Sequence, residues 1–282
     1  MFKEVATNVF EGSCPYCNNE AFVYIKGEKE MFLCHNCQRN IPYIKVKNAN
    51  SSVRDRISST SKSVHINFNS VLHLCNVLSS LPDIHPAVQY VRSRGFSDSM
   101  LDRVYYTSKF DEIGAVIGKQ VAGTKRLVLP FFNENDELFG LQGRILEGEG
   151  PRYATLIFDE NEDRFFGKNA VDFSKQFFCV EGPIDSLFLE NAIAMAGVTN
   201  MPDKYKANAV ICLDNEPRNK AIVKRMGKFL DEGFSVVIWP DSVKPKDVND
   251  LKLSGYDPNQ IVKDNVYSGL QGKIKLNQWK KV

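Results

Sequence analysis

The second half of the sequence alternates short apolar runs with amphipathic segments, and this alternation restricts the fold more than any other feature. Short apolar runs suit buried strands, whereas the segments between them space their apolar side chains as helices do. The predicted strands are 176–180, 193–196, 209–213 and 234–239, and the predicted helices are 184–191 and 219–230. Strands that alternate with helices pair in parallel, so we expect an α/β fold built on a parallel sheet.

Acidic residues follow three of these predicted strands at the point where each strand ends. They are Glu181 and Asp185 after 176–180, Asp214 and Glu216 after 209–213, and Asp247 and Asp250 after 234–239. Taken alone, each acid suits a helix N-cap or a solvated loop. Because the carboxyl ends of parallel strands lie at one edge of a sheet, the acids together predict a carboxylate cluster that binds Mg²⁺. Such clusters are typical of metal-dependent phosphoryl transfer.

Four of the seven cysteines form two pairs near the N-terminus. Cys14 and Cys17 make one pair and Cys34 and Cys37 the other, with two residues inside each pair and sixteen between the pairs. This spacing predicts one structural zinc ion held by four thiolates, with His35 as an alternative ligand. The surrounding segment is too short to build a stable core alone, so zinc would supply much of its folding free energy.

Composition excludes several classes of protein. Lysine and arginine number 36 against 34 aspartates and glutamates, and this net charge of +2 excludes nucleic-acid binding by bulk charge alone. No apolar run approaches the roughly 18 residues of a membrane-spanning helix, and the first residues do not resemble a signal peptide. Cys75, Cys179 and Cys212 suit buried positions in a reducing environment. We therefore expect a cytoplasmic protein without a membrane partner.

Shifts in composition along the chain predict five segments. The stretch 47–63 is rich in serine, asparagine and charge, which favours a linker. Further on, 70–107 favours helices, and strands at 126–132 and 138–144 favour a hairpin. The segments are a zinc-binding ribbon (1–46), a linker (47–66), the first part of a core (67–172), its parallel-sheet part (173–250) and a basic C-terminal segment (251–282).

The acidic residues stand in motifs that resemble those of the toprim fold, which bacterial-type primases, topoisomerases and some nucleases share. The motifs are 181–185 (EGPID), 214–216 (DNE) and 246–250 (KDVND). Upstream, the segments 126–132, 139–144, 151–153 and 166–167 follow the order seen in bacterial replicative primases, whose architecture also includes a four-cysteine ribbon. The stretches 180–191 and 213–218 are similar to the compact DNA primases of T-even-type bacteriophages.

This resemblance implies a DNA-dependent RNA primase, a nucleotidyltransferase that makes short RNA primers on single-stranded DNA for phage DNA replication. It implies a zinc ribbon, a linker and a catalytic core with a toprim subdomain, α+β overall. The implied substrates are ribonucleoside triphosphates, and the implied cofactors are structural Zn²⁺ and catalytic Mg²⁺ or Mn²⁺. A replicative helicase of the primosome is the implied partner, a single-stranded-DNA-binding protein is a further candidate, and the host cell cytoplasm is the implied compartment.

The resemblance also implies roles for individual residues. Magnesium ligands would be Glu181, Asp214, Glu216 and Asp247, with Asp185 and Asp250 beside them in the catalytic cluster, and Glu181 is an alternative general base. A basic groove for template and nucleotide would contain Arg126, Arg144, Arg152 and Tyr153, since arginine suits phosphate recognition. Two positions depart from the usual pattern. Glu216 stands where aspartate is common and Asn249 where an acid is common, so the metal ligand of the third motif stays open.

Two alternatives stay open at this point. One is another toprim enzyme, such as a nuclease, and the other is a non-catalytic zinc and toprim protein that only binds DNA during recombination. RNA synthesis on single-stranded DNA would separate the primase from both alternatives.

Overall fold

The computed structural model divides the chain into two compact units, Met1–His65 and Ile66–Val282. It describes residues 3–6, 9–13, 20–26, 29–34, 39–42 and 68–282, so the predicted linker at 47–66 lies outside the described residues. Within these described ranges, no helix is both long enough and apolar enough to cross a membrane.

The first unit is built on an antiparallel sheet in which each strand pairs with the next one along the chain. The strands are β1 (Lys3–Ala6), β2 (Val9–Ser13), β3 (Glu20–Lys26), β4 (Lys29–Cys34) and β5 (Arg39–Pro42). Ala21 and Val23 are both buried. They lie two positions apart on β3, so they share the buried face of the sheet.

The second unit contains two sheets, and the first is antiparallel in the order β10-β9-β8-β7-β6. Its strands are β6 (Asn76–Val77), β7 (Tyr105–Thr107), β8 (Lys125–Phe132), β9 (Leu138–Glu147) and β10 (Tyr153–Ile157). The predicted hairpin is confirmed as β8 and β9. In its turn, Oδ1 of Asn133 accepts hydrogen bonds from the backbone N–H groups of Asn135 and Glu137.

The helices beside this sheet are short. They are α2 (Pro86–Ser93), α3 (Asp98–Leu101) and α4 (Phe110–Val116), with 3₁₀ helices η1 (Phe68–Leu74) and η2 (Leu78–Ser80). As expected from the sequence, α2 begins after His85, whose Nδ1 accepts a hydrogen bond from the N–H of Ala87. The expectation that 70–107 is helical throughout is wrong at β6 and β7. These strands pair with each other, and β7 also pairs with β8, so the tyrosines of β7 extend the sheet.

The second sheet has the order β12-β11-β13-β14-β15 and is parallel except for β15, which confirms the predicted parallel sheet. Its strands are β11 (Phe177–Val180), β12 (Ala192–Ala194), β13 (Ala209–Cys212), β14 (Ser235–Val237) and β15 (Val266–Tyr267). Every residue of β11 and β13 is buried, as expected for strands covered on both faces. Cys179 and Cys212 are free thiols in this core, as predicted.

The helices around the parallel sheet place the segments that follow its strands. They are α5 (Pro183–Ser186), α6 (Lys220–Asp231), α7 (Val248–Leu253), α8 (Pro258–Asp264) and α9 (Gly269–Trp279). The predicted helix at 184–191 is wrong beyond Ser186. Asn191 takes a positive φ of 49° and donates hydrogen bonds to the carbonyls of Asp172 and Gln176, which fixes a turn into β12.

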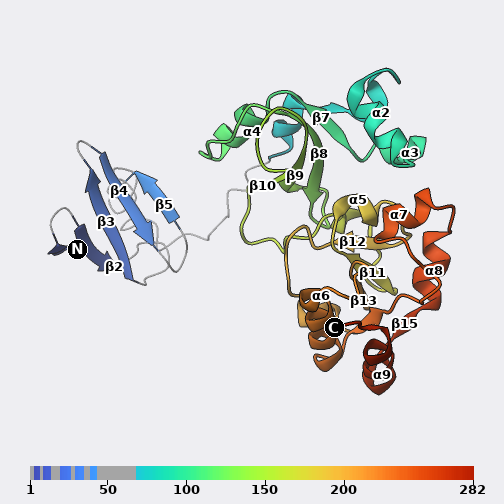
Figure 1. Ribbon diagram of the computed structural model, residues 1–282. Coiled ribbons are helices and arrows are strands. Elements are labelled where there is room, and N and C mark those ends of the chain that lie inside the picture. Colours follow the sequence, from blue (N-terminus) through green and yellow to red (C-terminus); the bar gives the residue numbers. More distant parts are fainter. Residues whose placement is uncertain (1–2, 7–8, 14–19, 27–28, 35–38, 43–67) are drawn as a thin grey trace. The chain divides into compact units, whose positions relative to one another are not determined.

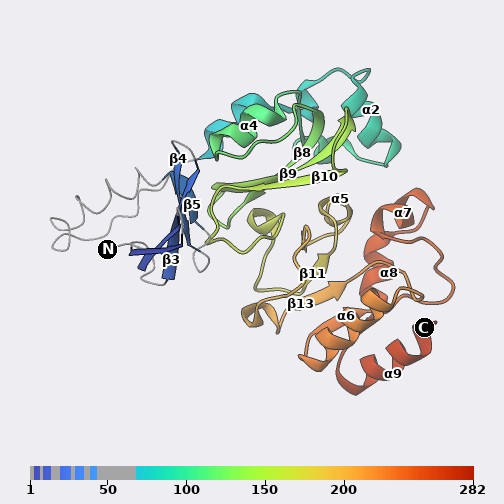
Figure 2. The same cartoon turned by 60° about the vertical axis from the view of Figure 1, so that its left-hand side comes forward.

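The two sheets of the second unit share one apolar core. Leu129 and Phe131 of β8 belong to the same buried cluster as Phe178 of β11. The rings of Phe131 and Phe166 lie 6.0 Å apart between their centroids. Figures 1 and 2 both show α5 and α7 on the side of the parallel sheet nearer the antiparallel sheet. Both α5, which follows β11, and α7 therefore lie on the side of the antiparallel sheet.

Candidate active site

Acidic side chains from separate segments gather where β11 and β13 end. Glu181 follows β11 directly, and Asp214 lies two residues beyond β13. The backbone nitrogen of Asp214 donates to Oε2 of Glu181 across 3.5 Å. Because Val180 pairs with Cys212 in parallel register, the two strands end at the same edge of the sheet. The structure therefore brings the first two acidic segments together.

Asp185 reaches the cluster from α5. Its Oδ1 accepts a hydrogen bond of 3.0 Å from the backbone N–H of Asn249. Gly182 lies just before α5, and a Cβ at this position would lie 2.7 Å from Oδ2 of Asp185. That separation is too short for a real contact, so glycine at 182 is what lets the Asp185 carboxyl turn back over the start of its helix.

The third acidic segment is held by α7 and by the loop before it. Asp247 caps α7, and its Oδ1 accepts a hydrogen bond of 2.8 Å from the N–H of Asp250. Asp250 therefore lies in the first turn of the helix. The side chain of Asn215 donates hydrogen bonds of 3.0 Å to the carbonyls of Val243 and Pro245. These bonds tie the second acidic segment to the third.

Burial and mutual repulsion make the central carboxyls hold their protons to unusually high pH. Burial, followed by the charge of Asp247, raises the pKa of Asp185 to about 7. Burial, followed by the charges of Glu181 and Asp247, raises the pKa of Asp214 to about 7. The pKa of Asp247 is also raised, chiefly by burial. A bound cation would relieve this repulsion, since it lowers the free energy of the ionised form of each carboxyl.

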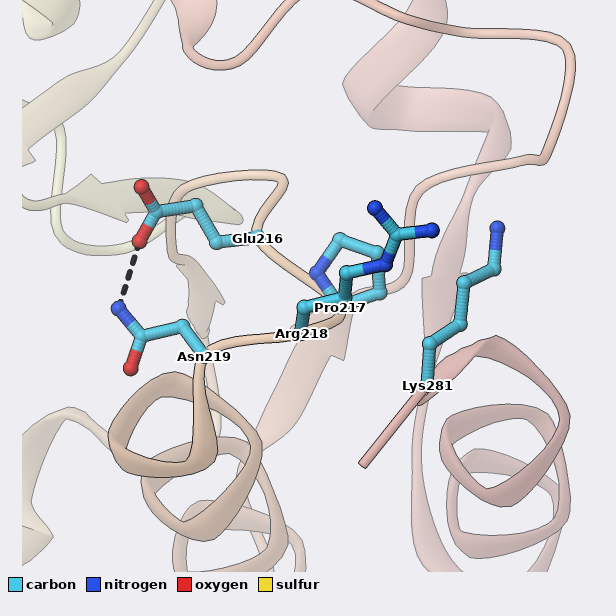
Figure 3. Close-up of a pocket in the computed structure, with 5 residues that line it drawn as sticks. All are labelled: Glu216, Pro217, Arg218, Asn219 and Lys281. Carbon is cyan, nitrogen blue, oxygen red and sulfur yellow. Dashed lines mark hydrogen bonds between the residues drawn. The ribbon is translucent and has the colours of Figure 1, made fainter.

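A lysine compensates the charge on one side of the cluster. The Nζ atom of Lys246 lies 3.0 Å from Oε1 of Glu216 and 3.6 Å from Oδ2 of Asp214. Glu216 also accepts a hydrogen bond of 2.7 Å from Asn219, which Figure 3 shows. The bond from Asn219 and the contact with Lys246 hold the pKa of Glu216 below its ordinary value. Glu216 is thus ionised at neutral pH while Asp214 is poised to gain or lose a proton.

Arg225 compensates Glu181 on the other side, and the sequence did not single it out. Its guanidinium donates to Oε1 of Glu181 and also contacts the sulfur of Met195 at 3.3 Å. Arg225 lies on α6, where Ile222 and Met226 mark the buried face. This pattern places Arg225 beside the buried face of α6. It does not indicate that Glu181 is its partner, because Glu181 follows β11 and lies 44 positions away in the sequence.

A cavity of about 490 Å³ opens beside the second acidic segment. It is lined by Glu216, Pro217, Arg218, Asn219 and Lys281. Figure 3 shows the charged ends of Arg218 and Lys281 on the same side of this cavity. The N–H of Lys281 donates a 2.8 Å hydrogen bond to the carbonyl of Pro217, so the segment after α9 forms part of the wall.

Three of the four predicted groove residues lie together on β9, at the start of β10 and directly before β10. Arg144 pairs with Tyr153 across the two strands and donates a hydrogen bond to its hydroxyl. The guanidinium of Arg144 lies 5.1 Å from the ring centroid of Tyr90 on α2 and 5.2 Å from that of Tyr153. Arg152 lies over the Tyr153 ring at 5.7 Å. The result is a basic and aromatic surface, which suits phosphates and bases.

Two polar atoms of this surface are buried without a partner among the described residues. They are Nε of Arg144 and the hydroxyl of Tyr90, which the sequence did not single out. Buried polar atoms without a partner are uncommon in folded proteins and often mark a place where a ligand or water completes the bonding. The structure therefore adds Tyr90 to the predicted surface.

Arg126 does not lie on this surface, and the predicted groove role is corrected for this residue. Its side chain is only 1% exposed. The guanidinium donates to Oγ1 of Thr124 and to the carbonyls of Gly143 and Pro151, and it stacks on the ring of Phe110 at 4.7 Å. These partners accept from its Nε and from one of its terminal nitrogens, so Arg126 joins β8, β9 and the 150s turn inside the protein.

The acidic cluster is suited to a divalent cation in its chemistry. Carboxylate oxygens are the ligands that Mg²⁺ prefers, and burial, followed by the charges of neighbouring acids, raises the pKa values of Asp185 and Asp214. Within the described residues, no group of three or more histidine, cysteine, aspartate or glutamate side chains is already arranged to hold a metal ion.

The predicted zinc ligands fall largely outside the described residues. Cys34 is the last residue of β4. Cys14, Cys17 and Cys37, and the alternative ligand His35, lie outside the described residues. The zinc site stays a prediction from the sequence.

Comparisons with known proteins find relatives in sequence and in fold. No family model matches the sequence. The DNA primase of Enterobacteria phage T4 is 33% identical over 222 residues, which cover 74% of this chain and 64% of the phage protein. The match thus leaves about a third of the length of that relative without a counterpart here.

Solved structures agree in fold. The RNA polymerase domain of Mycobacterium tuberculosis primase DnaG in complex with double-stranded DNA has a TM-score of 0.53 and 17% identity, over 70% of this chain and 78% of that chain. Another structure of this domain has a TM-score of 0.51 and 17% identity, over 66% of this chain and 78% of that chain. At this identity the likeness shows the fold. The sequence match shows that the chain is similar to the T4 DNA primase over these 222 residues.

Proposed function

We propose that the protein synthesises short RNA primers on single-stranded DNA, as a nucleotidyltransferase of phage DNA replication. The observation that carries this proposal is the convergence of Glu181, Asp185, Asp214 and Asp247 at one sheet edge. This convergence occurs in a chain related to a DNA primase. A cluster of this kind is what phosphoryl transfer with divalent cations requires.

In this proposal the acids of the cluster have two roles. The ligands of Mg²⁺ or Mn²⁺ would be Glu181, Asp214, Glu216 and Asp247. Two further acids, Asp185 on α5 and Asp250 on α7, would lie beside these ligands. Ions held there would supply positive charge for the triphosphate and for the departing pyrophosphate. Lys246 keeps Glu216 ionised, and Arg225 pairs with Glu181. Most of the acceleration comes from positioning and electrostatics.

The surface around Arg144 and Tyr153 would hold the template strand and the incoming nucleotide. Arg152 is exposed, so it is available to phosphate oxygens. Arg144 keeps an unpaired Nε, and Tyr90 keeps an unpaired hydroxyl beneath it. Rings stacked with guanidinium groups give a surface on which bases stack without regard to sequence.

The first unit would act as the zinc ribbon that helps to select the start site. Zn²⁺ would be held by Cys14, Cys17, Cys34 and Cys37, whose spacing supports a four-thiolate site. A linker at 47–66 would join the ribbon to the catalytic core, and 67–172, 173–250 and 251–282 would be the parts of that core and its basic extension. A replicative helicase and a single-stranded-DNA-binding protein are the proposed partners in the host cytoplasm.

A synthesis assay tests this proposal. The protein is incubated with single-stranded DNA, Mg²⁺ and labelled ribonucleoside triphosphates, and short RNA products are expected. Asp214→Asn should abolish synthesis and leave binding of single-stranded DNA within about twofold, because the loss of one ligand removes the metal chemistry and not the template surface. Asp203→Asn is the matched control, since Asp203 is exposed and pairs only with Lys206.

Two results would overturn the proposal. Cleavage of the DNA without RNA products would indicate a nuclease of the same fold. DNA binding without either reaction, in protein that retains divalent cations, would indicate the non-catalytic role in recombination.

A further inference from the structure

Arg94 and Asn249 hold α2 and α7 together although they lie 155 positions apart in the sequence. A guanidinium N–H of Arg94 donates to Oδ1 of Asn249, and Nδ2 of Asn249 donates back to the carbonyl of Arg94 at 2.6 Å. The side chain of Asn249 is completely buried. Both ends of the amide are thus occupied by the same residue, which fixes its orientation.

This reciprocal contact is connected directly to the acidic cluster. The backbone N–H of Asn249 donates to Oδ1 of Asp185 at 3.0 Å. Asn249 also lies in the first turn of α7, two residues after its cap, Asp247. A displacement of Asn249 would therefore move the donor to Asp185 and the start of the helix that carries Asp247.

The chemistry of the amide explains why asparagine stands where an acid is common. A carboxylate at 249 could accept the hydrogen bond from Arg94 but could not donate to the carbonyl of Arg94. It would also place a further negative charge beside Asp185, whose pKa the neighbouring acids already raise. Arg94 supplies positive charge to this region without being a carboxylate partner in a direct ion pair.

Arg94 also contacts the basic and aromatic surface. Its guanidinium lies 5.6 Å from the ring centroid of Tyr90, and the same ring faces Arg144 at 5.1 Å. One side chain thus reaches both the surface that would hold the template and the helix that carries the third acidic segment.

We infer that Arg94 is a positioning residue that fixes α7 against α2 and thereby sets the affinity of the acidic cluster for divalent cations. The inference rests on the proposed function for its biological meaning, but the affinity for a cation is measured without any synthesis. Residues that orient metal ligands without touching the metal typically change affinity by about 10–100-fold when they are replaced.

The test measures binding of Mn²⁺ by electron paramagnetic resonance of the free ion, together with thermal unfolding and binding of single-stranded DNA. Arg94→Lys keeps the charge and the backbone carbonyl that accepts from Nδ2 of Asn249, but it replaces the rigid planar guanidinium that donates to Oδ1 with a flexible ammonium group. We expect it to bind Mn²⁺ about tenfold more weakly, with DNA affinity within about twofold of the unchanged chain. Arg92→Lys is the matched control on the same helix, because Arg92 bonds only Phe96 and Asp98 and should leave Mn²⁺ affinity unchanged.

A second variant keeps the inference testable if Arg94→Lys lowers stability. Asn249→Ser removes the amide from the opposite side. If both residues act through one contact, combining Arg94→Lys with Asn249→Ser should cause no further loss of Mn²⁺ affinity beyond that of the more impaired single variant. Additive losses would overturn the inference.

Two further outcomes are decisive. Unchanged Mn²⁺ affinity in folded Arg94→Lys overturns the inference, and so does a selective loss of DNA affinity, which would make Arg94 a template contact. If the unchanged chain makes no RNA while Arg94→Lys still loses Mn²⁺ affinity, the proposed function fails and the positioning role stands.

Discussion

Arg225 on α6 donates a hydrogen bond from its guanidinium to Oε1 of Glu181, at the carboxyl end of β11. Both side chains are largely buried, with 23% and 26% of their surface exposed. The arginine therefore occupies the position of a counter-charge for a carboxylate that is proposed to bind metal. We expect the ion pair of Arg225 and Glu181 to stabilise the fold when no cation is bound. When a cation is bound, Arg225 and the cation would compete for the Glu181 carboxylate.

Arg225→Gln tests this competition. Without divalent cations, the free energy of unfolding should fall by about 1–2 kcal/mol, because a partly buried charged hydrogen bond is lost. With saturating Mg²⁺ the loss should shrink, since the ion replaces the missing charge. Urea unfolding with EDTA and with Mg²⁺ measures both values. Lys228→Gln, on the same helix but paired with exposed Glu232, is the control, and an equal loss in both conditions would contradict the competition.

The stability of the metal-free protein should fall as the pH rises. The pKa values of Asp185 and Asp214 are raised from 3.8 to about 7. Between these values the folded protein binds protons that the unfolded chain releases, so the stabilising protonation present at low pH is lost as the pH passes 7. Between pH 5.5 and 8, the free energy of unfolding of Asp214→Asn should fall by about 1–2 kcal/mol less than that of the unchanged protein. Urea unfolding in EDTA measures both values. Parallel profiles for the two proteins would contradict this assignment.

Gly182→Ala should impair the site more than the fold. Its new Cβ would lie 2.7 Å from Oδ2 of Asp185, so the carboxyl must move and its bond to the N–H of Asn249 is strained. We expect primer synthesis to fall by roughly tenfold or more, because small displacements of catalytic groups are costly. Gly227→Ala is the control, since a Cβ there meets Leu276 at an ordinary 3.8 Å. It should raise stability by about 0.5–1 kcal/mol without affecting synthesis. Equal synthesis by the two variants would refute the tight packing at 182.

The parallel sheet could be predicted because its determinants are local. Short apolar runs separated by amphipathic segments specify β11, β13 and α6, and each acid of the cluster follows a strand in the sequence. Since parallel strands end at a common edge, the meeting of Glu181 with Asp214 follows from topology alone. The early end of α5 could not be predicted in the same way, because the turn at Asn191 depends on carbonyls of residues 15 and 19 positions away.

The roles of the arginines could not be predicted, because they depend on the partners that the fold brings to each buried side chain. Arg126 and Arg144 have similar sequence surroundings on neighbouring strands, and the sequence predicts phosphate binding for both. Arg126 is enclosed by Thr124 and Phe110, whereas Arg144 keeps an unpaired donor beside Tyr90. Arg94 carried no motif at all, since its partner Asn249 lies 155 residues away.

The two arginines should therefore respond differently to substitution by lysine. Arg126→Lys should lower the free energy of unfolding by about 2–3 kcal/mol, because the buried carbonyls of Gly143 and Pro151 lose their donor. The folded fraction should bind single-stranded DNA normally. Arg144→Lys should instead weaken DNA binding by about tenfold with a smaller loss of stability, since lysine cannot stack between two tyrosine rings. Fluorescence anisotropy with labelled DNA, together with urea unfolding, separates the effects. A loss of DNA affinity in folded Arg126→Lys would instead indicate that Arg126 takes part in DNA binding.

Zinc should be present at one ion per chain and should depend on the cysteine pairs. Cys34→Ser should abolish the zinc signal in elemental analysis, because a structural site with four thiolates does not tolerate the loss of a ligand in so small a unit. Cys75→Ser is the control, since Cys75 is a free thiol of the second unit.

If the first unit selects the start site, Cys34→Ser should reduce primer initiation by at least about tenfold and leave extension of a supplied primer nearly unchanged, since the carboxylate cluster lies in the second unit. Unchanged zinc content in Cys34→Ser would refute the four-cysteine site, and an equal loss of initiation and extension would refute its separate role.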